Sequence, residues 1–248
     1  MQKTVLISGG SRGIGKATAA HLARQGWQVA FTFRNNRAAA DETVRRIGQD
    51  NGNALAIKGN TACEADVIRA FDQTIETFGG LDAVVVNAGI VAPSMPLAEM
   101  SLDRLQSVFD TNVLGALLFA RESARRLPEV KTGEDGSIVF VSSIAARLGS
   151  PFEYVDYAAS KGAIDTLTVG LSKELAPDGI RVNAVRPGVI ETDIHASGGQ
   201  PDRAKRVGQS VPIARPGTAE EVANAIAWLC SHEASYCTGA ILDVTGGR

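Results

Sequence analysis

The stretch TVLISGGSRGIG, residues 4–15, decides the fold. Its first part, Thr4–Ser8, is mostly apolar and β-branched and predicts a buried strand, and Ile14–Gln25 has the composition of a helix. Glycines between them let the chain turn sharply and approach a ligand closely. A helix N-terminus behind such a turn offers free N–H groups and a positive dipole end to a pyrophosphate. The stretch predicts a dinucleotide-binding unit, with a glycine-rich turn that binds nothing as the alternative.

The rest of the chain continues this alternation of strands and helices. Further strands are expected at Trp27–Phe33, Ala54–Lys58, Asp82–Val86, Ser137–Ser142, Ile180–Val185 and Ala240–Val244. Further helices are expected at Arg37–Gln49, Glu64–Phe78, from Ser101 to about Leu127 with or without a break, at Val155–Ala176 and at Ala219–Cys230. Strands that are apolar throughout suit a parallel sheet covered on both faces. The expected fold class is α/β: a single-domain, doubly wound Rossmann fold with a seven-stranded parallel sheet and helices on both faces.

No linker or low-complexity tract divides the chain, so residues 1–248 are expected to form one domain. Pro187–Pro216 is a long stretch without a clear sheet partner. Long irregular segments in compact domains often form lids or binding loops. We therefore expect a substrate lid at about residues 190–210.

Composition excludes several classes of partner. The net charge of −2 and the pI near 6.0 give no single-sign field that would gather nucleic acid or an anionic membrane. No apolar run approaches the roughly 20 residues of a membrane span, and the start lacks the pattern of a signal peptide, so a cytoplasmic location is expected. The cysteines and histidines are too scattered to form a metal site from sequence neighbours: Cys63, Cys230, Cys237, His21, His195 and His232.

The end of the second expected strand indicates which dinucleotide is preferred. NAD-binding proteins commonly have an acidic residue there, about 20 residues after the glycine turn, which bonds the ribose 2′-hydroxyl. Here no acidic residue occurs between Gly15 and Asp41, while Arg34 ends the strand and Arg12 lies in the glycine turn. Two guanidiniums suit a 2′-phosphate. NADP(H) is therefore expected to be preferred, with NAD(H) possible, unless Arg34 and Arg37 are merely solvated surface residues.

Tyr157 and Lys161 form a candidate acid–base pair at the start of the long helix. Residues four apart share one helix face, and an ammonium near a phenol lowers the phenol pKa from about 10. Tyr157 would then exchange a proton near neutral pH. Tyr154 has Ala158 at the corresponding position and so lacks such a partner. A chance surface pair is the alternative.

Other polar residues are expected to share a crevice with this pair. Ligands of an open parallel sheet bind at the carboxyl ends of its strands, where the glycine turn and Ser142–Ser143 both lie. A serine hydroxyl there can donate a hydrogen bond to a substrate oxygen. Asn112 falls within a helix, where a buried amide usually needs a specific partner.

These residues together resemble the short-chain dehydrogenase/reductase family over nearly the whole chain, in its branch of bacterial glucose dehydrogenases and 3-oxoacyl-[acyl-carrier-protein] reductases. The motifs that carry the resemblance are Ser8-Gly9-x-x-x-Gly13-x-Gly15, Asn87-Ala88-Gly89, Asn112, Ser143, Tyr157-x-x-x-Lys161 and Arg186-Pro187-Gly188. Each motif is short, and their order and spacing make the resemblance specific.

The resemblance implies a role for each catalytic candidate. Tyr157 resembles the general acid/base, and Lys161 resembles the residue that holds the nicotinamide ribose and lowers the tyrosine pKa. Ser143, rather than Ser142, resembles the serine that polarises the carbonyl. Asn112 resembles the residue that holds a water in a proton relay to the lysine.

The motifs and the resemblance together give a set of expected cofactor-binding residues. The set is Gly9, Ser11, Arg12, Gly13, Ile14, Gly15, Arg34, Asn60, Thr61, Asn87, Ala88, Gly89, Tyr157, Lys161, Pro187, Gly188, Val189, Ile190 and Thr192. The segment at about Asp193–Arg206 matches the family's mobile substrate lid. No metal ligand is expected.

Three departures from the family pattern concern the site. Ser8 stands where threonine is usual and keeps a hydroxyl, and Asn60 stands where an aspartate commonly reaches the adenine. The tyrosine follows Ser143 by one residue more than is usual, which implies a one-residue insertion around Gly149–Asp156 at the mouth of the site.

The expected function is NADP(H)-dependent hydride transfer to or from a small carbonyl or alcohol substrate. A 3-oxoacyl-[acyl-carrier-protein] reductase is the first alternative, although Glu134, Asp135 and Asp178 do not suit an acidic carrier. A non-catalytic NADP(H)-binding sensor is an alternative of another class. The family is usually tetrameric, so the resemblance also implies a homotetramer built on the helices around Asp103–Leu127 and Val155–Ala176.

Overall fold

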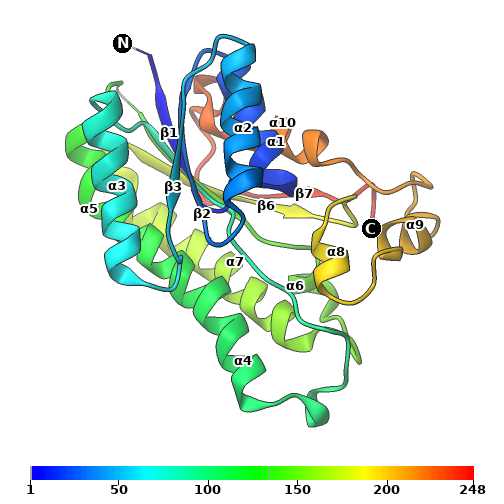
Figure 1. The fold of residues 1–248 in the computed structure, drawn as a ribbon. Helices are drawn as coiled ribbons and strands as arrows, with labels where there is room; N and C mark the ends of the chain where they lie inside the picture. The colour runs from blue at the N-terminus through cyan, green and yellow to red at the C-terminus, as the bar shows by residue number, and fades with distance from the viewer. Residues whose placement is uncertain (1, 134) are drawn as a thin grey trace.

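A seven-stranded, wholly parallel sheet forms the middle layer of the molecule (Figure 1). The computed structural model describes residues 2–133 and 135–248. Its strands are β1 (Thr4–Ile7), β2 (Gln28–Phe33), β3 (Ala54–Lys58), β4 (Ala83–Val86), β5 (Gly136–Val141), β6 (Ile180–Pro187) and β7 (Ile241–Val244). Their order is β3-β2-β1-β4-β5-β6-β7, so the order reverses between β1 and β4. The carboxyl ends of these two strands form the edge at which doubly wound sheets bind ligands.

Helices cover both faces of the sheet and bury a separate apolar core on each. One face carries α1 (Gly13–Arg24), α2 (Arg37–Gln49) and α10 (Ala219–Cys230), with Leu22, Phe31 and Ile226 in its core. The other face carries α3 (Glu64–Phe78), α5 (Gly115–Val130) and α7 (Val155–Leu175), with Phe71, Phe119 and Ile164 in its core. Covering both faces explains why the strands are apolar at consecutive positions rather than at alternate ones.

The expected fold class is confirmed, and element boundaries differ by a few residues. The helical stretch expected from Ser101 has the break that was allowed for: it forms α4 (Leu102–Phe109) and α5, joined by a π-helical turn at Asp110–Leu114. It also runs past Leu127, because Pro128 lies near the C-terminal end, where the loss of one N–H donor interrupts little. Short elements complete the chain: α6 (Ala145–Leu148), α8 (Ile194–Ser197), α9 (Arg203–Gly208) and 3₁₀ turns at Leu97–Glu99, Ala176–Asp178 and His232–Ala234.

The segment expected to form a lid contains α8 and α9 and lies beyond the carboxyl end of β6, beside the C-terminus (Figure 1). One isolated parallel bridge, between Ile190 and Gly217, ties its two ends together. The segment with the expected insertion contains two non-glycine residues with positive φ, Ser150 at 46° and Phe152 at 62°. This backbone conformation is unfavourable for residues with a Cβ, so the path of the segment is set by its surroundings.

Candidate active site

A cavity of about 480 Å³ opens at the carboxyl ends of the strands. Its lining includes every expected cofactor-binding residue except Gly15, together with Ser143, Tyr157 and Lys161 of the catalytic candidates. Asn112 does not line it. Motifs spread over most of the chain thus meet at one place.

The glycine turn is packed backbone against backbone. Gly9 has a φ of 71°, and a Cβ on it would lie 3.2 Å from the Cα of Ala88. A Cβ on Gly15 would lie 2.2 Å from the carbonyl oxygen of Gly9 and 2.6 Å from Nδ2 of Asn87. Gly15 is therefore packed against the turn and does not line the cavity, and the expectation that it contacts the cofactor stays a prediction.

Ser8 and Asn87 hold the ends of β1 and β4 together. The Ser8 hydroxyl oxygen accepts hydrogen bonds from the backbone N–H groups of Asn87 and Ala88, each at 2.9 Å. Nδ2 of Asn87 donates to the carbonyl oxygens of Ser8 at 3.0 Å and Gly9 at 2.9 Å. Serine in place of threonine thus keeps the oxygen that these contacts need, and the pair fixes the glycine turn against the fourth strand.

Two exposed guanidiniums lie at the end of the cavity next to β2. Arg12 and Arg34 both line it, with Asn35 and Asn36 beside them. Arg37 instead forms an ion pair with Asp41 at 2.8 Å and lies over the Phe33 ring, so it is the surface residue that the alternative interpretation described. Among the described residues that line the cavity, the one acidic residue is Asp193, in the segment expected to form a lid.

Asn60 is engaged by its own turn. Its side-chain oxygen accepts a hydrogen bond from the backbone N–H of Ala62 at 3.3 Å, and its backbone N–H donates to Asp66 at 2.8 Å. The latter hydrogen bond, followed by that from Arg69, lowers the pKa of Asp66. Asn60, which stands where an aspartate commonly reaches the adenine, thus already uses its side-chain oxygen as an acceptor within the protein.

Ser143 and Tyr157 present two adjoining hydroxyls to the cavity. They share a hydrogen bond, and the Ser143 oxygen also accepts from the backbone N–H of Ala145 at 3.1 Å. Ser142 points elsewhere, since its hydroxyl donates to Asp165 at 2.6 Å, which favours Ser143 as the site serine. Burial raises the pKa of Tyr157, and the hydrogen bond with Ser143 opposes this rise. The net shift is thus opposite to the lowering expected from Lys161, because desolvation of the phenolate is the largest effect on this group.

Lys161 lies behind the phenol in a buried position. Its Nζ donates to the Val141 carbonyl oxygen at 2.7 Å and lies 5.6 Å from the centre of the Tyr157 ring. Burial lowers the pKa of Lys161 to about 8, and the Asp165 carboxylate acts in the opposite direction. The ammonium thus loses its proton at a pH close to neutrality, which suits a group that passes protons.

Asn112 acts through the backbone of the neighbouring strand end. Its oxygen accepts from the Ile90 N–H at 2.8 Å, and its Nδ2 donates to the Ile90 oxygen at 3.0 Å and to the Ser160 hydroxyl at 3.1 Å. The π-helical turn at Asp110–Leu114 is where a helix can present such a side chain inward. A Cβ on Gly89 would lie 3.4 Å from the Asn112 oxygen and 3.5 Å from Nζ of Lys161, so the two groups meet at this glycine.

The substrate end of the cavity contains residues that the sequence did not indicate. Tyr154, expected to lack a partner, lines the cavity, and its hydroxyl accepts a hydrogen bond from Gln200 at 2.8 Å. Burial raises its pKa. Arg203 lies over the Tyr154 ring and forms a two-pronged ion pair with Glu153 at 2.7 and 2.8 Å. We call the Arg203–Glu153 ion pair and the Gln200–Tyr154 hydrogen bond the lid latch, because they join the segment expected to form a lid to the residues just before α7.

A buried ion pair supports Tyr157 from the side. Arg104 on α4 donates hydrogen bonds to both carboxylate oxygens of Asp156, at 2.9 and 3.2 Å, and also to the Pro93 carbonyl oxygen. Both side chains are largely shielded from solvent. Asp156 directly precedes Tyr157, so this pair ties the start of α7 to α4. Neither partner belongs to a sequence motif that would have revealed it.

Two features are absent from the described residues. These residues contain no group of three or more histidine, cysteine or acidic side chains placed to hold a metal ion. None of the helices described has both the length and the apolar character needed to cross a bilayer.

A doubly wound sheet with a glycine turn after β1 and a Ser–Tyr–Lys set lining the same cavity defines a nicotinamide-dependent oxidoreductase. Comparisons with known proteins agree. The family model described as "Enoyl-(Acyl carrier protein) reductase" matches residues 9–248. The chain belongs to the short-chain dehydrogenase/reductase family, as its motifs indicated, and is an enzyme that acts on carbonyl or alcohol groups with NAD(P).

Three similar proteins illustrate the relationship. The chain is 49% identical to the uncharacterized oxidoreductase YgfF of Escherichia coli, with 98% of each chain covered. It is 36% identical to glucose 1-dehydrogenase 2 of Bacillus subtilis, over 99% of this chain and 94% of the other. The crystal structure of 3-ketoacyl-(acyl-carrier-protein) reductase from Brucella melitensis complexed with NADH superimposes with a TM-score of 0.91 at 32% identity, covering 99% and 98% of the two chains.

Proposed function

We propose that this enzyme transfers hydride between NADP(H) and a small carbonyl or alcohol substrate, with Tyr157 as general acid/base. The observation that carries the proposal is the pair of hydroxyls of Ser143 and Tyr157, hydrogen-bonded to each other at the cavity wall with buried Lys161 behind them. Two donors that converge on one point suit a carbonyl oxygen on which charge develops.

The cavity also fits the cofactor. The N-terminus of α1 follows a glycine turn whose backbone lies open to the cavity, as a pyrophosphate requires. Lys161 and Gly89 line the middle, and Pro187 and Thr192 line the side near the lid. When bound, NADPH would supply the hydride, and the protein would supply orientation and protons.

The chain's own groups then divide the work of reduction. Ser143 and Tyr157 donate hydrogen bonds to the carbonyl oxygen and hold it in place. Tyr157 releases its proton to that oxygen as the alkoxide forms, and Lys161 favours the resulting phenolate with its positive charge. Asn112 keeps the Ile90 backbone in position beside the lysine. The same steps in reverse serve oxidation, with the phenolate as base.

The preference for NADP(H) rests on Arg12 and Arg34. They lie at the end of the cavity next to β2, where a ribose 2′-phosphate would bind, and no acidic residue lines this end among the residues that the structure describes. A carboxylate, which would select the 2′-hydroxyl of NAD, is thus replaced by cations.

A 3-oxoacyl-[acyl-carrier-protein] reductase is the second candidate. Asp135 and Asp178 precede β5 and β6 and therefore lie at the opposite end of the sheet from the cavity, so they give no argument against a carrier; Glu134 lies outside the described residues. The observation in favour is charge at the mouth, where Arg203, Arg206 and Arg248 all act electrostatically on Glu153. Such a mouth would suit an acidic carrier.

The test is oxidation of NADPH and of NADH, followed by loss of the reduced-nicotinamide absorbance, against ketones, aldehydes, sugars, diketones and acetoacetyl thioesters. Tyr157→Phe is the matched control, since it deletes one oxygen. We expect turnover with NADPH that falls at least about 100-fold in the variant, as for loss of a general acid. Turnover unaffected by the variant would overturn the role of Tyr157, and turnover restricted to carrier thioesters would favour the second candidate.

We also propose a homotetramer. Phe109, Leu117 and Val169 are 40–43% exposed on α4, α5 and α7, the helices that the family resemblance places in the contact. Light scattering after gel filtration would give the mass directly, and a monomer would overturn this proposal. The cytoplasmic location expected from the sequence stays a prediction.

A further inference from the structure

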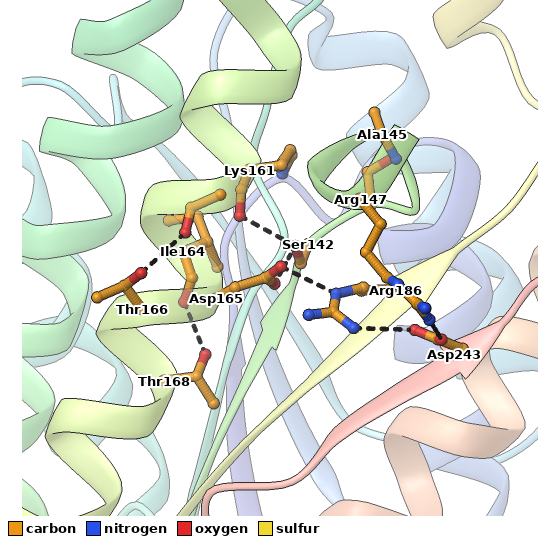
Figure 2. Close-up of polar contacts among 12 residues, drawn as sticks. Ser142, Ala145, Arg147, Lys161, Ile164, Asp165, Thr166, Thr168, Arg186 and Asp243 are labelled. Carbon is orange, nitrogen blue, oxygen red and sulfur yellow. Dashed lines mark hydrogen bonds and ion pairs between the residues drawn. The ribbon is translucent and has the colours of Figure 1, made fainter. Parts of the chain in front are cut away.

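Asp165 lies behind the active site, on the helical turn of α7 that follows Lys161 (Figure 2). Its Oδ1 accepts the hydroxyl hydrogen of Ser142 at 2.6 Å, and its Oδ2 accepts from Nε of Arg186 at 2.9 Å. The carboxylate therefore joins three elements: α7, the end of β5 and the end of β6. Ser143 and Pro187, the residues that follow its two partners, both line the cavity, whereas Asp165 does not.

The ion-pair chain continues outward and becomes more exposed. Arg186 also reaches Asp243 on β7 at 3.3 Å, and Arg147 on α6 meets the same carboxylate at 2.8 Å (Figure 2). The side chains of Asp165 and Arg186 are 13% and 16% exposed, but that of Arg147 is 60% exposed. Water screens the outer link, so the inner pair is the one with energetic weight.

Charged and titratable groups linked to Lys161 or to Asp165 lie on several elements near α7. The side chains are Tyr157 and Asp165 on α7 itself, Arg186 on β6, Asp243 on β7, Arg147 on α6, and Arg104 on α4, which is paired with Asp156. Of these, Asp165 is the charged group with a resolved effect on the lysine, and it favours the ammonium. Burial disfavours the charged ammonium because it removes water from it, and the Asp165 carboxylate offsets part of this desolvation cost.

We propose that Asp165, held by Arg186, is a positioning residue for the active site. It fixes the strand end that carries Ser143 against α7, and its carboxylate, one helical turn after Lys161, favours the charged form of that lysine. The kinetic consequence rests on the proposed function, whereas the effect on Lys161 is a property of the chain alone.

The direct test is an NMR titration of the Lys161 ε-carbon in the full chain, assigned by its loss in Lys161→Arg. Asp165→Asn keeps the shape and an acceptor for Ser142 but removes the charge, so the Lys161 midpoint should fall by on the order of one pH unit. Arg186→Gln removes the facing cation, so the midpoint should rise. Damage to the fold would not produce shifts of opposite sign.

Two further variants make the test specific. Ser142→Ala breaks the hydrogen bond but leaves the charge, and should leave the Lys161 midpoint within a few tenths of a pH unit while lowering turnover at every pH. Arg147→Gln removes the exposed outer link and should change neither quantity. A Lys161 midpoint that is the same in wild type, Asp165→Asn and Arg186→Gln would overturn the proposal.

The kinetic measurement separates this proposal from the proposed function. In Asp165→Asn, the alkaline limb of kcat for carbonyl reduction should move to lower pH by the same amount as the lysine titration. A titration that moves without the kinetic limb would support the charge assignment and overturn the role of Lys161 in catalysis. If neither moves while both Asp165→Asn and Ser142→Ala lower Tm equally, Asp165 is structural and the proposal fails.

Discussion

The two ends of the crevice are held by different kinds of contact. At the cofactor end, backbone lies against backbone, with no room for a Cβ between Gly15 and the Gly9 carbonyl. At the substrate end, side chains distant in sequence are joined by the lid latch, Arg203–Glu153 and Gln200–Tyr154. Packed backbone cannot yield, whereas partly exposed polar side chains can exchange a partner for water. Substitutions should therefore have large effects on stability and cofactor binding at the cofactor end, and small effects on substrate binding at the substrate end.

The largest effect is expected for Gly15→Ala. The added methyl would lie 2.2 Å from the Gly9 oxygen, so the turn must move away from its cofactor-binding position. We expect a loss of stability of about 1–3 kcal/mol, typical of an overpacked core, measured by urea unfolding. NADPH binding, measured by calorimetry, should weaken more than about tenfold.

Gly48→Ala is the matched control for the same added methyl. It lies within α2, and a Cβ there meets nothing within 4 Å. It should raise stability slightly, by up to about 1 kcal/mol, because alanine favours the helix. Normal NADPH affinity in Gly15→Ala would break the contrast between the two ends.

The second effect is the pH dependence of the rates of carbonyl reduction and alcohol oxidation, which is set by Tyr157 and Lys161. Its raised pKa keeps the phenol protonated at neutral pH, as carbonyl reduction requires. Reduction should therefore be steady up to the Lys161 pKa of about 8 and fall above it, since the ammonium is then lost. Alcohol oxidation needs the phenolate and should rise with pH, at most tenfold per unit. Steady-state rates in both directions would check this, and oxidation that declines between pH 7 and 9 would contradict it.

The third effect is selective for one cofactor. Arg34→Gln removes a guanidinium at the cavity wall, and should weaken NADPH binding about tenfold to a hundredfold, the range of a charge-assisted hydrogen bond. NADH binding should change little, because it lacks the 2′-phosphate. Arg37→Gln is the control, since Arg37 is paired with Asp41 at the surface. An equal loss of NADPH and NADH affinity in Arg34→Gln would show that Arg34 does not bind the 2′-phosphate.

The contrast between the ends also explains what could be predicted from the sequence. The glycine turn, Asn87–Gly89 and Tyr157–Lys161 are each motifs of only a few residues, and strand ends bring them together by topology. The fold could be predicted because apolar strand segments alternate along the chain with helical segments. Tyr154 could not be interpreted in this way, because its partner, Gln200, lies 46 residues away on a segment without periodicity.

Proximity in sequence was also not enough to predict pKa values and ion pairs. The spacing of Tyr157 and Lys161 predicted that they lie together, and they do. The pKa of Tyr157 nevertheless rises, because burial, which depends on the whole fold, has the largest effect on it. Asp165 and Arg186 show the same limit. They are 21 residues apart on a helix and a strand, and nothing in either segment indicates that they pair beneath Ser142.

The smallest effect is expected at the lid latch. Glu153→Gln should break the ion pair with Arg203 and raise KM for the carbonyl substrate about threefold, the scale of an exposed ion pair. The kcat and the NADPH affinity should stay unchanged, because neither residue touches the glycine turn. Arg203 lowers the pKa of Glu153, so the latch holds at neutral pH and is lost only as pH falls through that lowered value.

Glu42→Gln is the matched control, because Glu42 forms an ion pair of the same length with Arg45 on α2, away from the cavity. It should leave KM unchanged. A rise in KM in Glu153→Gln without loss of NADPH affinity would show that the two ends respond independently. Loss of NADPH affinity in this variant would instead mean that the latch also positions the segment from Pro187 to Thr192, which lines the cofactor side, and the crevice would then act as one unit.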